Sequence, residues 1–154
     1  MEATVTILVD YESELARRVA GDIWSGLSRA ALGGGAGHAR ITASWDSLRE
    51  PQGLDSSGGP SVRIFVVEQG LPEAIDAVVA PELGSSLLYG VVVAVPEAAS
   101  PLSGPLLYQG VERLTAGGVR VGAVEPAVLH AVPQECESYA QRLIERLRSL
   151  QGRR

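Results

Sequence analysis

Short apolar runs alternate along this chain with segments whose apolar residues recur at helical spacing, and this alternation limits the possible folds more than any other property of the sequence. The runs at 4–9, 62–67 and 90–95 are rich in β-branched residues, as in strands that are buried on both faces of a parallel sheet. The stretch after the first run repeats its apolar residues every four positions, from Leu15 to Leu27. Strands that alternate with helices favour a parallel sheet with right-handed crossovers.

This alternation predicts an α/β fold with a three-layer, doubly wound architecture of the flavodoxin-like or Rossmann-like kind and a mainly parallel, five-stranded sheet. The strands are expected at 4–9, 39–44, 62–67, 90–95 and 119–124. Helices are expected after Ser13, which serves as an N-cap, and over 72–83, 104–116 and about 137–150, the last one amphipathic. The Gly-, Ser- and Pro-rich residues 51–60 predict a loop where such a fold normally has a helix. With 154 residues and 45% apolar content, the chain is expected to form a single α/β domain over 1–154.

Composition excludes several classes of function. All 13 basic residues are arginines, so the chain has no lysine for a Schiff base or for a P-loop phosphate site. The net charge of -5, with the arginines scattered singly, argues against nucleic acid as a partner. The single cysteine excludes an internal disulfide bond, and the longest apolar run is too short to span a bilayer. We therefore expect a cytoplasmic protein with no membrane partner, no metal and no cofactor.

The candidate ligand-binding residues follow the predicted strands, because open α/β sheets bind ligands at the carboxyl ends of their strands. Several carboxylates gather there and would repel a phosphate, although the helix start near Ser13 favours an anion. One hypothesis is a site for a cation or for a partner's arginine, with Asp10, Glu68 and Glu97 as ligands; Arg49, from the same or a neighbouring subunit, would reverse the charge. The alternative is that these acids only favour helix starts. The predicted ligand-binding residues are Asp10, Tyr11, Ser13, Glu14, Arg49, Gln69, Gly70, Glu97, Ser103 and Gly104.

No catalytic residue is assigned from the sequence. His38 lies in a glycine-rich loop and is expected to be solvated, while His130 is expected at an interface or a helix end. The thiolate of Cys136 is disfavoured by the acidic residues on either side of it. Trp24 and Trp45 are expected to be packing residues rather than stacking platforms.

Several segments of the chain together resemble one known family. Residues Val9–Glu14 keep Ser13 of a G-S-x-S-D loop that follows a first strand. Further along, 89–93 is similar to a G-V-P-V segment, 102–104 to L-S-G and 118–124 to G-I-P-V-G. In this order the segments resemble the PurE family, whose members interconvert aminoimidazole ribonucleotide and its carboxylated forms.

The resemblance fails where that family has its catalytic residues. Residues 46–51 match the family's S-A-H-R-T-P motif only at Arg49 and Pro51, and Leu48 stands at the position of the catalytic histidine. Residues 68–73 lack the A-A-H step of a second motif. In that family the imidazole of the histidine transfers a proton to and from the substrate. Without this histidine, the motif has no side chain that can act as the general acid or base.

The resemblance therefore implies a divergent PurE-like protein without carboxylase or mutase activity, which acts as a small-ligand-binding or protein-interaction homo-oligomer. A small nucleotide-like molecule is the ligand class that it implies. The apolar stripe of the last helix, Tyr139, Leu143, Ile144 and Leu147, is the sequence basis for predicting self-association. Two alternatives remain open: an active aminoimidazole ribonucleotide carboxylase or mutase (a lyase or an isomerase) of purine biosynthesis, and a flavodoxin-like module.

Overall fold

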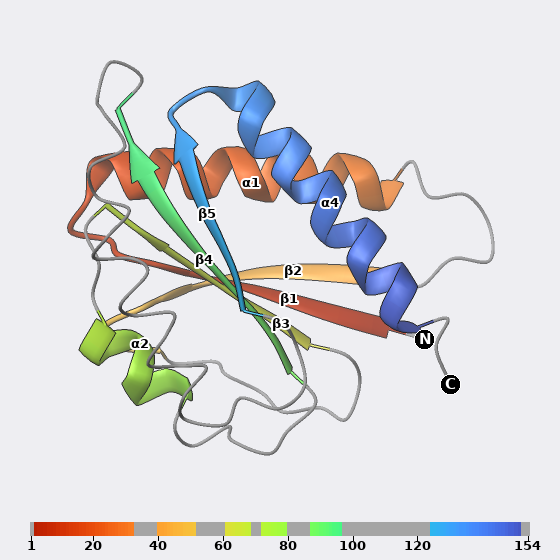
Figure 1. The fold of residues 1–154 in the computed structure, drawn as a ribbon, viewed down its shortest axis with the longest axis horizontal. Coiled ribbons are helices and arrows are strands. Elements are labelled where there is room, and N and C mark those ends of the chain that lie inside the picture. The colour runs from red at the N-terminus through yellow and green to blue at the C-terminus, as the bar shows by residue number, and fades with distance from the viewer. Residues whose placement is uncertain are drawn as a thin grey trace.

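The computed structural model describes residues 2–32, 40–51, 61–68, 72–79, 87–96 and 124–151. Within them lies a five-stranded sheet in the order β2-β1-β3-β4-β5, with every neighbouring pair parallel (Figure 1). The strands are β1 (Glu2–Val9), β2 (Arg40–Ser47), β3 (Ser61–Val67), β4 (Leu87–Val95) and β5 (Val124–His130). The chain moves outward from β1 to β2 and then crosses to β3, so the strand order reverses between β1 and β3. This is the switch point at which such sheets bind ligands.

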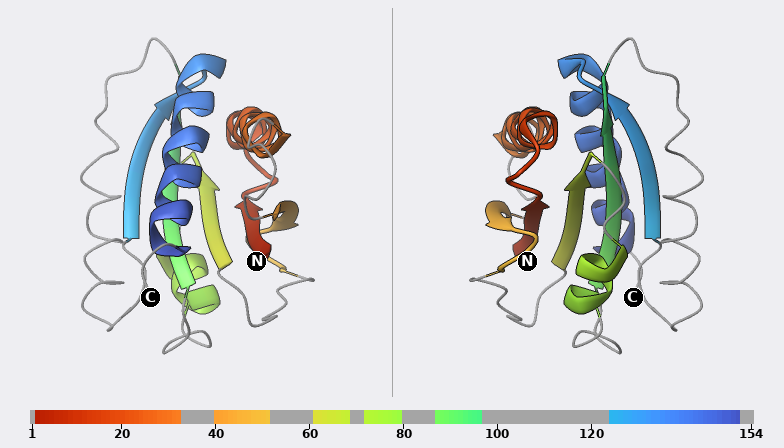
Figure 2. Two further views of the ribbon diagram at one scale, coloured as in Figure 1. Left: turned by 90° about the vertical axis from the view of Figure 1, so that its right-hand side faces the viewer. Right: turned by 90° about the vertical axis from the view of Figure 1, so that its left-hand side faces the viewer.

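Helices cover both faces of the sheet, which makes three layers. The long helices α1 (Glu14–Leu32) and α4 (Pro133–Gln151) lie side by side on one face, and the short α2 (Pro72–Val79) lies on the other (Figures 1 and 2). The α/β, doubly wound and parallel fold expected from the sequence is confirmed in this part of the chain.

The strands divide their side chains between two apolar clusters, because successive residues of a strand point to opposite faces. Val5, Ile7 and Val9 of β1 pack under α1 and α4. Leu8 packs on the opposite face, with Phe65 of β3. Both faces being buried explains why these strands appear in the sequence as apolar runs rather than as alternating patterns.

Helices α1 and α4 approach each other closely at a glycine. A Cβ atom at Gly26 would lie 3.0 Å from Cβ of Ala140 and 3.1 Å from Cα of Glu137. A Cβ atom at Gly21 of the same helix would meet nothing within 4 Å. Gly26 is thus a packing glycine, which lets the two backbones come together.

The last strand is not where the sequence analysis placed it. The prediction was 119–124, whereas β5 spans Val124–His130 and pairs with β4. Pro126 and Glu125 interrupt the apolar pattern here. Proline is nevertheless tolerated because β5 is an edge strand, with one side free of ladder hydrogen bonds. The earlier residues 119–123 lie outside the described part, as do the predicted helix 104–116 and most of the predicted loop 51–60.

Helix α4 uses its apolar stripe within the chain. The helix begins at Pro133, four residues before the predicted start, and proline suits a first helical turn. Tyr139, Leu143 and Ile144 are buried in the cluster that α4 shares with α1. These three residues of the stripe are therefore not exposed and do not support self-association, so the predicted homo-oligomer stays a prediction.

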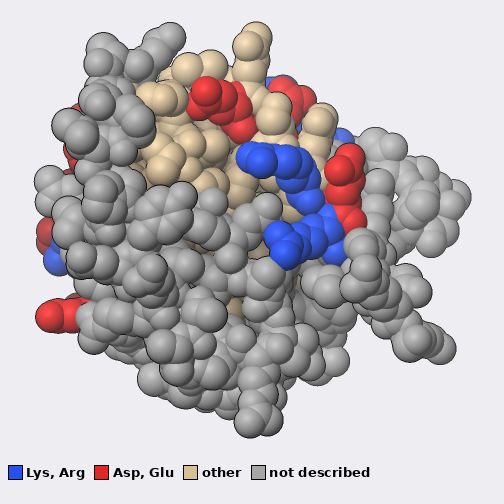
Figure 3. Space-filling model, viewed as in Figure 1, with Lys and Arg blue, Asp and Glu red and all other residues tan. Residues whose placement is uncertain are grey.

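The outward face of α4 is polar. Its exposed residues include charged side chains of both signs, and Figure 3 shows red and blue patches over this region. Glu135, Arg142 and Glu145 are among them. No helix of the described part is long and apolar enough to cross a membrane.

Candidate binding edge

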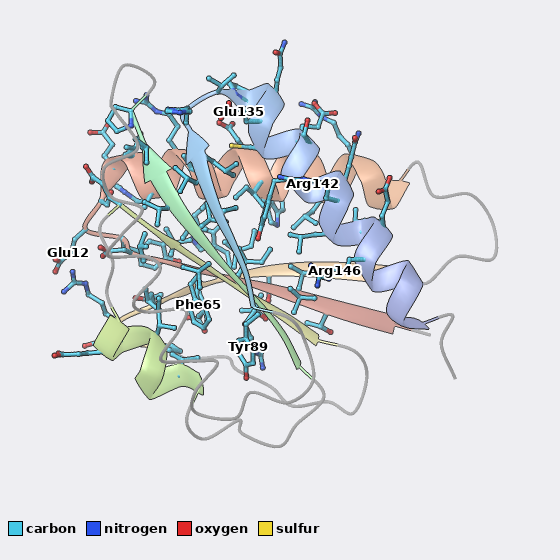
Figure 4. The ribbon with its side chains drawn as sticks, in the orientation of Figure 1. Glu12, Phe65, Tyr89, Glu135, Arg142 and Arg146 are labelled. Atoms are coloured by element: carbon cyan, nitrogen blue, oxygen red, sulfur yellow. The ribbon has the colours of Figure 1, made fainter. Side chains whose placement is uncertain are left out.

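The carboxyl ends of β1, β2 and β3 bring together five of the predicted ligand-binding residues. The turn between β1 and α1 is short: Val9 ends the strand and Glu14 begins the helix. Glu12 projects outward from this turn (Figure 4). The residues that the structure places at this edge are Asp10, Tyr11, Ser13, Glu14 and Arg49.

Arg49 joins two carboxylates of the turn. Its Nε lies 3.1 Å from Oδ1 of Asp10, and its Nη2 lies 3.1 Å from Oε2 of Glu12. The Asp10 carboxylate raises the pKa of the guanidinium, first through the hydrogen bond and then through its charge. The sequence analysis expected Arg49 to reach toward the acids of this edge from the same or a neighbouring subunit. In the structure Arg49 of the same chain makes this contact.

The backbone explains why Arg49 arrives there. The amide of Leu48 donates to the carbonyl oxygen of Val9, at 2.9 Å, so the chain after β2 stays beside the end of β1. The Leu48 side chain is 1% exposed and sits in the cluster on the α2 face. Asp10 is in turn fixed by its own amide, which donates to the carbonyl oxygen of Val66 in β3 at 3.1 Å.

Ser13 caps α1 and also binds a carboxylate. The amide of Ala16 donates to Oγ of Ser13 at 3.1 Å, which confirms the predicted N-cap. The Ser13 hydroxyl donates to Oε2 of Glu68, at 2.6 Å. Glu68 follows β3, so a carboxylate from a neighbouring strand lies at the start of α1, where the helix dipole favours negative charge.

Tyr11 and Trp45 form an exposed stacked pair at this edge. Their ring centroids are 6.5 Å apart, with the planes inclined by 18°, and their side chains are 41% and 36% exposed. Burial, and then the charge of Asp46, raise the pKa of Tyr11. Trp45 was expected to be a packing residue rather than a stacking platform, and its stack with Tyr11 at the surface corrects that expectation. Trp24 is 43% exposed.

The sequence analysis omitted part of this edge from its list of binding residues. Glu12 and Trp45 were not included, and Glu68 was named only in the hypothesis of a site for a cation or a partner's arginine, although Glu12 and Glu68 stand directly beside residues on the list. Only the parallel pairing of β1 with β2 brings Trp45 next to the turn. The remaining predicted residues, Gln69, Gly70, Glu97, Ser103 and Gly104, lie outside the described part of the chain, as does His38.

Two further side chains lie away from this edge. His130 ends β5, and its Nδ1 lies 3.2 Å from the carbonyl oxygen of Pro96, while its amide donates to Oε2 of Glu135 at 2.9 Å. Cys136 is buried, and burial together with Asp22 and Glu135 raises the pKa of its thiol to about 11. A thiol with that pKa is almost wholly protonated at neutral pH and is a poor nucleophile.

A polar row crosses the sheet on its α2 face. Arg63 of β3 is 2% exposed, and its Nη1 donates to Oγ1 of Thr6 at 2.8 Å. Oγ1 of Thr6 lies 3.3 Å from the Ser44 hydroxyl. Nearby, Phe65 and Tyr89 stack with their centroids 6.2 Å apart (Figure 4). Among the described residues, no group of three or more His, Cys, Asp or Glu side chains is arranged to hold a metal ion.

Comparison with known proteins identifies the fold but no family. No family model matches the sequence, and no curated protein does. A flavodoxin of Streptococcus pneumoniae TIGR4 superposes with a TM-score of 0.58 at 14% identity, over 97% of this chain and 99% of that one. An FMN-dependent NADH-azoreductase of Bacillus anthracis, solved in complex with FMN, superposes with a TM-score of 0.56 at 8% identity, over 94% and 100%. Neither is a PurE protein, so these comparisons give the PurE resemblance no support. The chain therefore has a flavodoxin-like α/β fold.

Proposed function

We propose that this chain is a flavodoxin-like binding module that engages its partner at the acidic carboxyl edge and does not carry FMN. Flavodoxins, whose sheets have this strand order, bind FMN at the switch point between β1 and β3. In this chain the switch point is lined by carboxylates, and these carboxylates already form hydrogen bonds and ion pairs with other residues of the chain. The function of an edge without a flavin is then to bind another molecule.

The observation that carries the proposal is the contact between Glu68 and Ser13. The Glu68 carboxylate accepts the Ser13 hydroxyl at 2.6 Å, at the start of α1. A helix N-terminus at a switch point is where a phosphate would be bound. Here a carboxylate of the chain itself already supplies the negative charge.

The charges of the neighbouring carboxylates also oppose the binding of a phosphate. Asp10 and Glu12 belong to the turn that would have to wrap the phosphate, and Glu14 is exposed in the first turn of the helix. Two like charges about 4 Å apart repel by about 4 kcal/mol at an effective dielectric constant of about 20. Arg49 offsets part of this charge, but its guanidinium is engaged by the same two acids.

FMN carriage is the second candidate, because the fold is that of a flavodoxin and of an azoreductase solved with FMN. The PurE-like carboxylase hypothesis has weaker support. Leu48, which replaces the histidine of that family in the resemblance, is buried in an apolar cluster with Phe65 and Val67. A leucine in that position transfers no proton.

Flavin fluorescence tests the proposal. The protein is titrated into FMN and, in parallel, into riboflavin, which lacks the phosphate. We expect no quenching of FMN up to about 100 μM protein, which corresponds to weak or absent binding. Binding of FMN in the low micromolar range, or a yellow protein after purification, would overturn the proposal.

A matched pair of variants tests the part assigned to Glu68. Glu68→Gln and Glu145→Gln each remove one negative charge, but Glu145 is exposed on α4. If the carboxylate at the start of α1 excludes phosphate, Glu68→Gln raises the affinity for FMN above that of Glu145→Gln. Higher FMN affinity in Glu145→Gln would contradict the assignment.

A further inference from the structure

The stacked pair of Tyr11 and Trp45 presents aromatic surface to solvent at the edge strand of the sheet. β2 is the outermost strand beside β1, and Trp45 is level with Ile7 in the ladder. Tyr11 comes from the turn that follows β1. Each residue is more than a third exposed, and the two rings stack on one another.

The surroundings of the pair are negative. Asp10, Glu12 and Glu14 flank Tyr11 in the sequence, while Asp46 and Glu50 follow Trp45. Arg49 is the one cation in these two segments, and it is bound to Asp10 and Glu12. Glu14 and Glu50 are exposed, and within the described residues neither forms a salt bridge.

We propose that the Tyr11–Trp45 pair and its carboxylate rim bind an arginine side chain presented by a basic segment of a partner protein. This rests on the proposed binding function and names the partner of the same edge. Aromatic faces attract cations, and a planar guanidinium stacks on them while it donates hydrogen bonds to carboxylates at its rim. Arg49 shows that this edge accommodates a guanidinium, through the two contacts of 3.1 Å that it makes.

The charge also decides against other occupants. An anionic lipid surface or a nucleic acid backbone would meet carboxylates on both sides of the pair, and its approach would be opposed. The lysine ammonium is a compact, strongly hydrated charge that does not stack as a plane does. An arginine is therefore the side chain that uses both the rings and the acids.

The two tryptophans provide a readout with an internal control. In a protein labelled with ¹⁵N, each indole N–H gives one signal, and Trp24 and Trp45 are exposed to similar extents on different elements. The signals are assigned with Trp24→Phe and Trp45→Phe. The probe is a blocked pentapeptide with two arginines among glycines, and matched peptides carry lysine or the neutral isostere citrulline in their place.

We expect the arginine peptide to shift the Trp45 signal and leave the Trp24 signal in place, the lysine peptide to bind more weakly, and the citrulline peptide not to bind. Trp45→Leu is expected to lower the affinity about threefold to tenfold, read from backbone amides of the turn, while Trp24→Leu leaves it unchanged. A thermal melt of each variant shows that it is folded.

Three results would overturn the inference. The first is a Trp45 signal that does not move up to about 10 mM arginine peptide. The second is equal binding of the arginine and lysine peptides that is unaffected by Trp45→Leu, which would show that only the carboxylates, and not the aromatic rings, bind the peptide. The third is a Trp45 signal that shifts with protein concentration alone, which would make a second copy of this chain the occupant. None of these results depends on whether FMN binds. The peptide titration can therefore contradict this inference without contradicting the proposed function, and the flavin titration can do the reverse.

Discussion

The sheet face under α1 and α4 and the carboxyl edge of the same sheet are stabilised in different ways. The face is closed by apolar side chains such as Ile23 and Leu143, with 0% and 1% exposure. The edge is closed by hydrogen bonds and ion pairs, in which Ser13 holds Glu68 and Arg49 holds Asp10. Apolar burial is roughly additive and holds the fold together, whereas exposed ion pairs contribute little to stability. The two regions therefore differ in what a substitution removes: apolar burial on the face, and at the edge hydrogen bonds and ion pairs whose members range from the buried Asp10 to the exposed Glu12.

The largest effect is expected on the face. Leu143→Ala removes a buried side chain of α4 and leaves a cavity against α1, so the free energy of unfolding should fall by about 2–5 kcal/mol. Urea denaturation followed by circular dichroism measures it. Gln141→Ala, at an exposed position of the same helix, should change it by less than about 0.5 kcal/mol. If Leu143→Ala and Gln141→Ala lowered the free energy of unfolding equally, the buried face of α4 would contribute no more to stability than its exposed face.

The close approach of α1 and α4 predicts an effect of intermediate size. Gly21→Ala and Gly26→Ala gain the same helix propensity, about 1 kcal/mol, but only the second puts a Cβ atom 3.0 Å from Ala140. We expect Gly26→Ala to be less stable than Gly21→Ala by about 1–3 kcal/mol, the usual penalty for overpacking. Two variants of equal stability would show that the helices can separate at no cost.

The smallest effect belongs to the edge. Ser13→Ala removes the N-cap of α1 and should lower the free energy of unfolding by about 1 kcal/mol. Asparagine and aspartate are both good N-caps, but the aspartate would face Glu68. Ser13→Asp should therefore be less stable than Ser13→Asn, and Glu68→Gln should abolish that difference. A Ser13→Asp variant as stable as Ser13→Asn in the native background would contradict the position given to Glu68.

Sequence patterns predicted the elements well where one physical rule acted alone. β1, β3 and β4 were found because strands buried on both faces are continuous apolar runs. The prediction failed at β5, where Pro126 and Glu125 disrupt such a run and are tolerated only because the strand lies at an edge. The sequence analysis used the stripe of α4 as the basis for self-association, whereas Tyr139, Leu143 and Ile144 pack within the chain. The pattern alone does not distinguish the two, since an apolar helix face packs equally well on a neighbouring helix or on another subunit.

The alternation of strands with helices and the acidity of the loops after β1 and β2 are local properties, and they could be predicted from the sequence. The contacts between these residues could not be predicted, because they join segments that lie far apart in the chain. Arg49 and Asp10 are 39 residues apart, and Ser13 and Glu68 are 55 residues apart. Their contacts exist because the strand order places β2 and β3 on either side of β1. The order of strands in a sheet is set by the packing of the whole chain, so no local pattern encodes it.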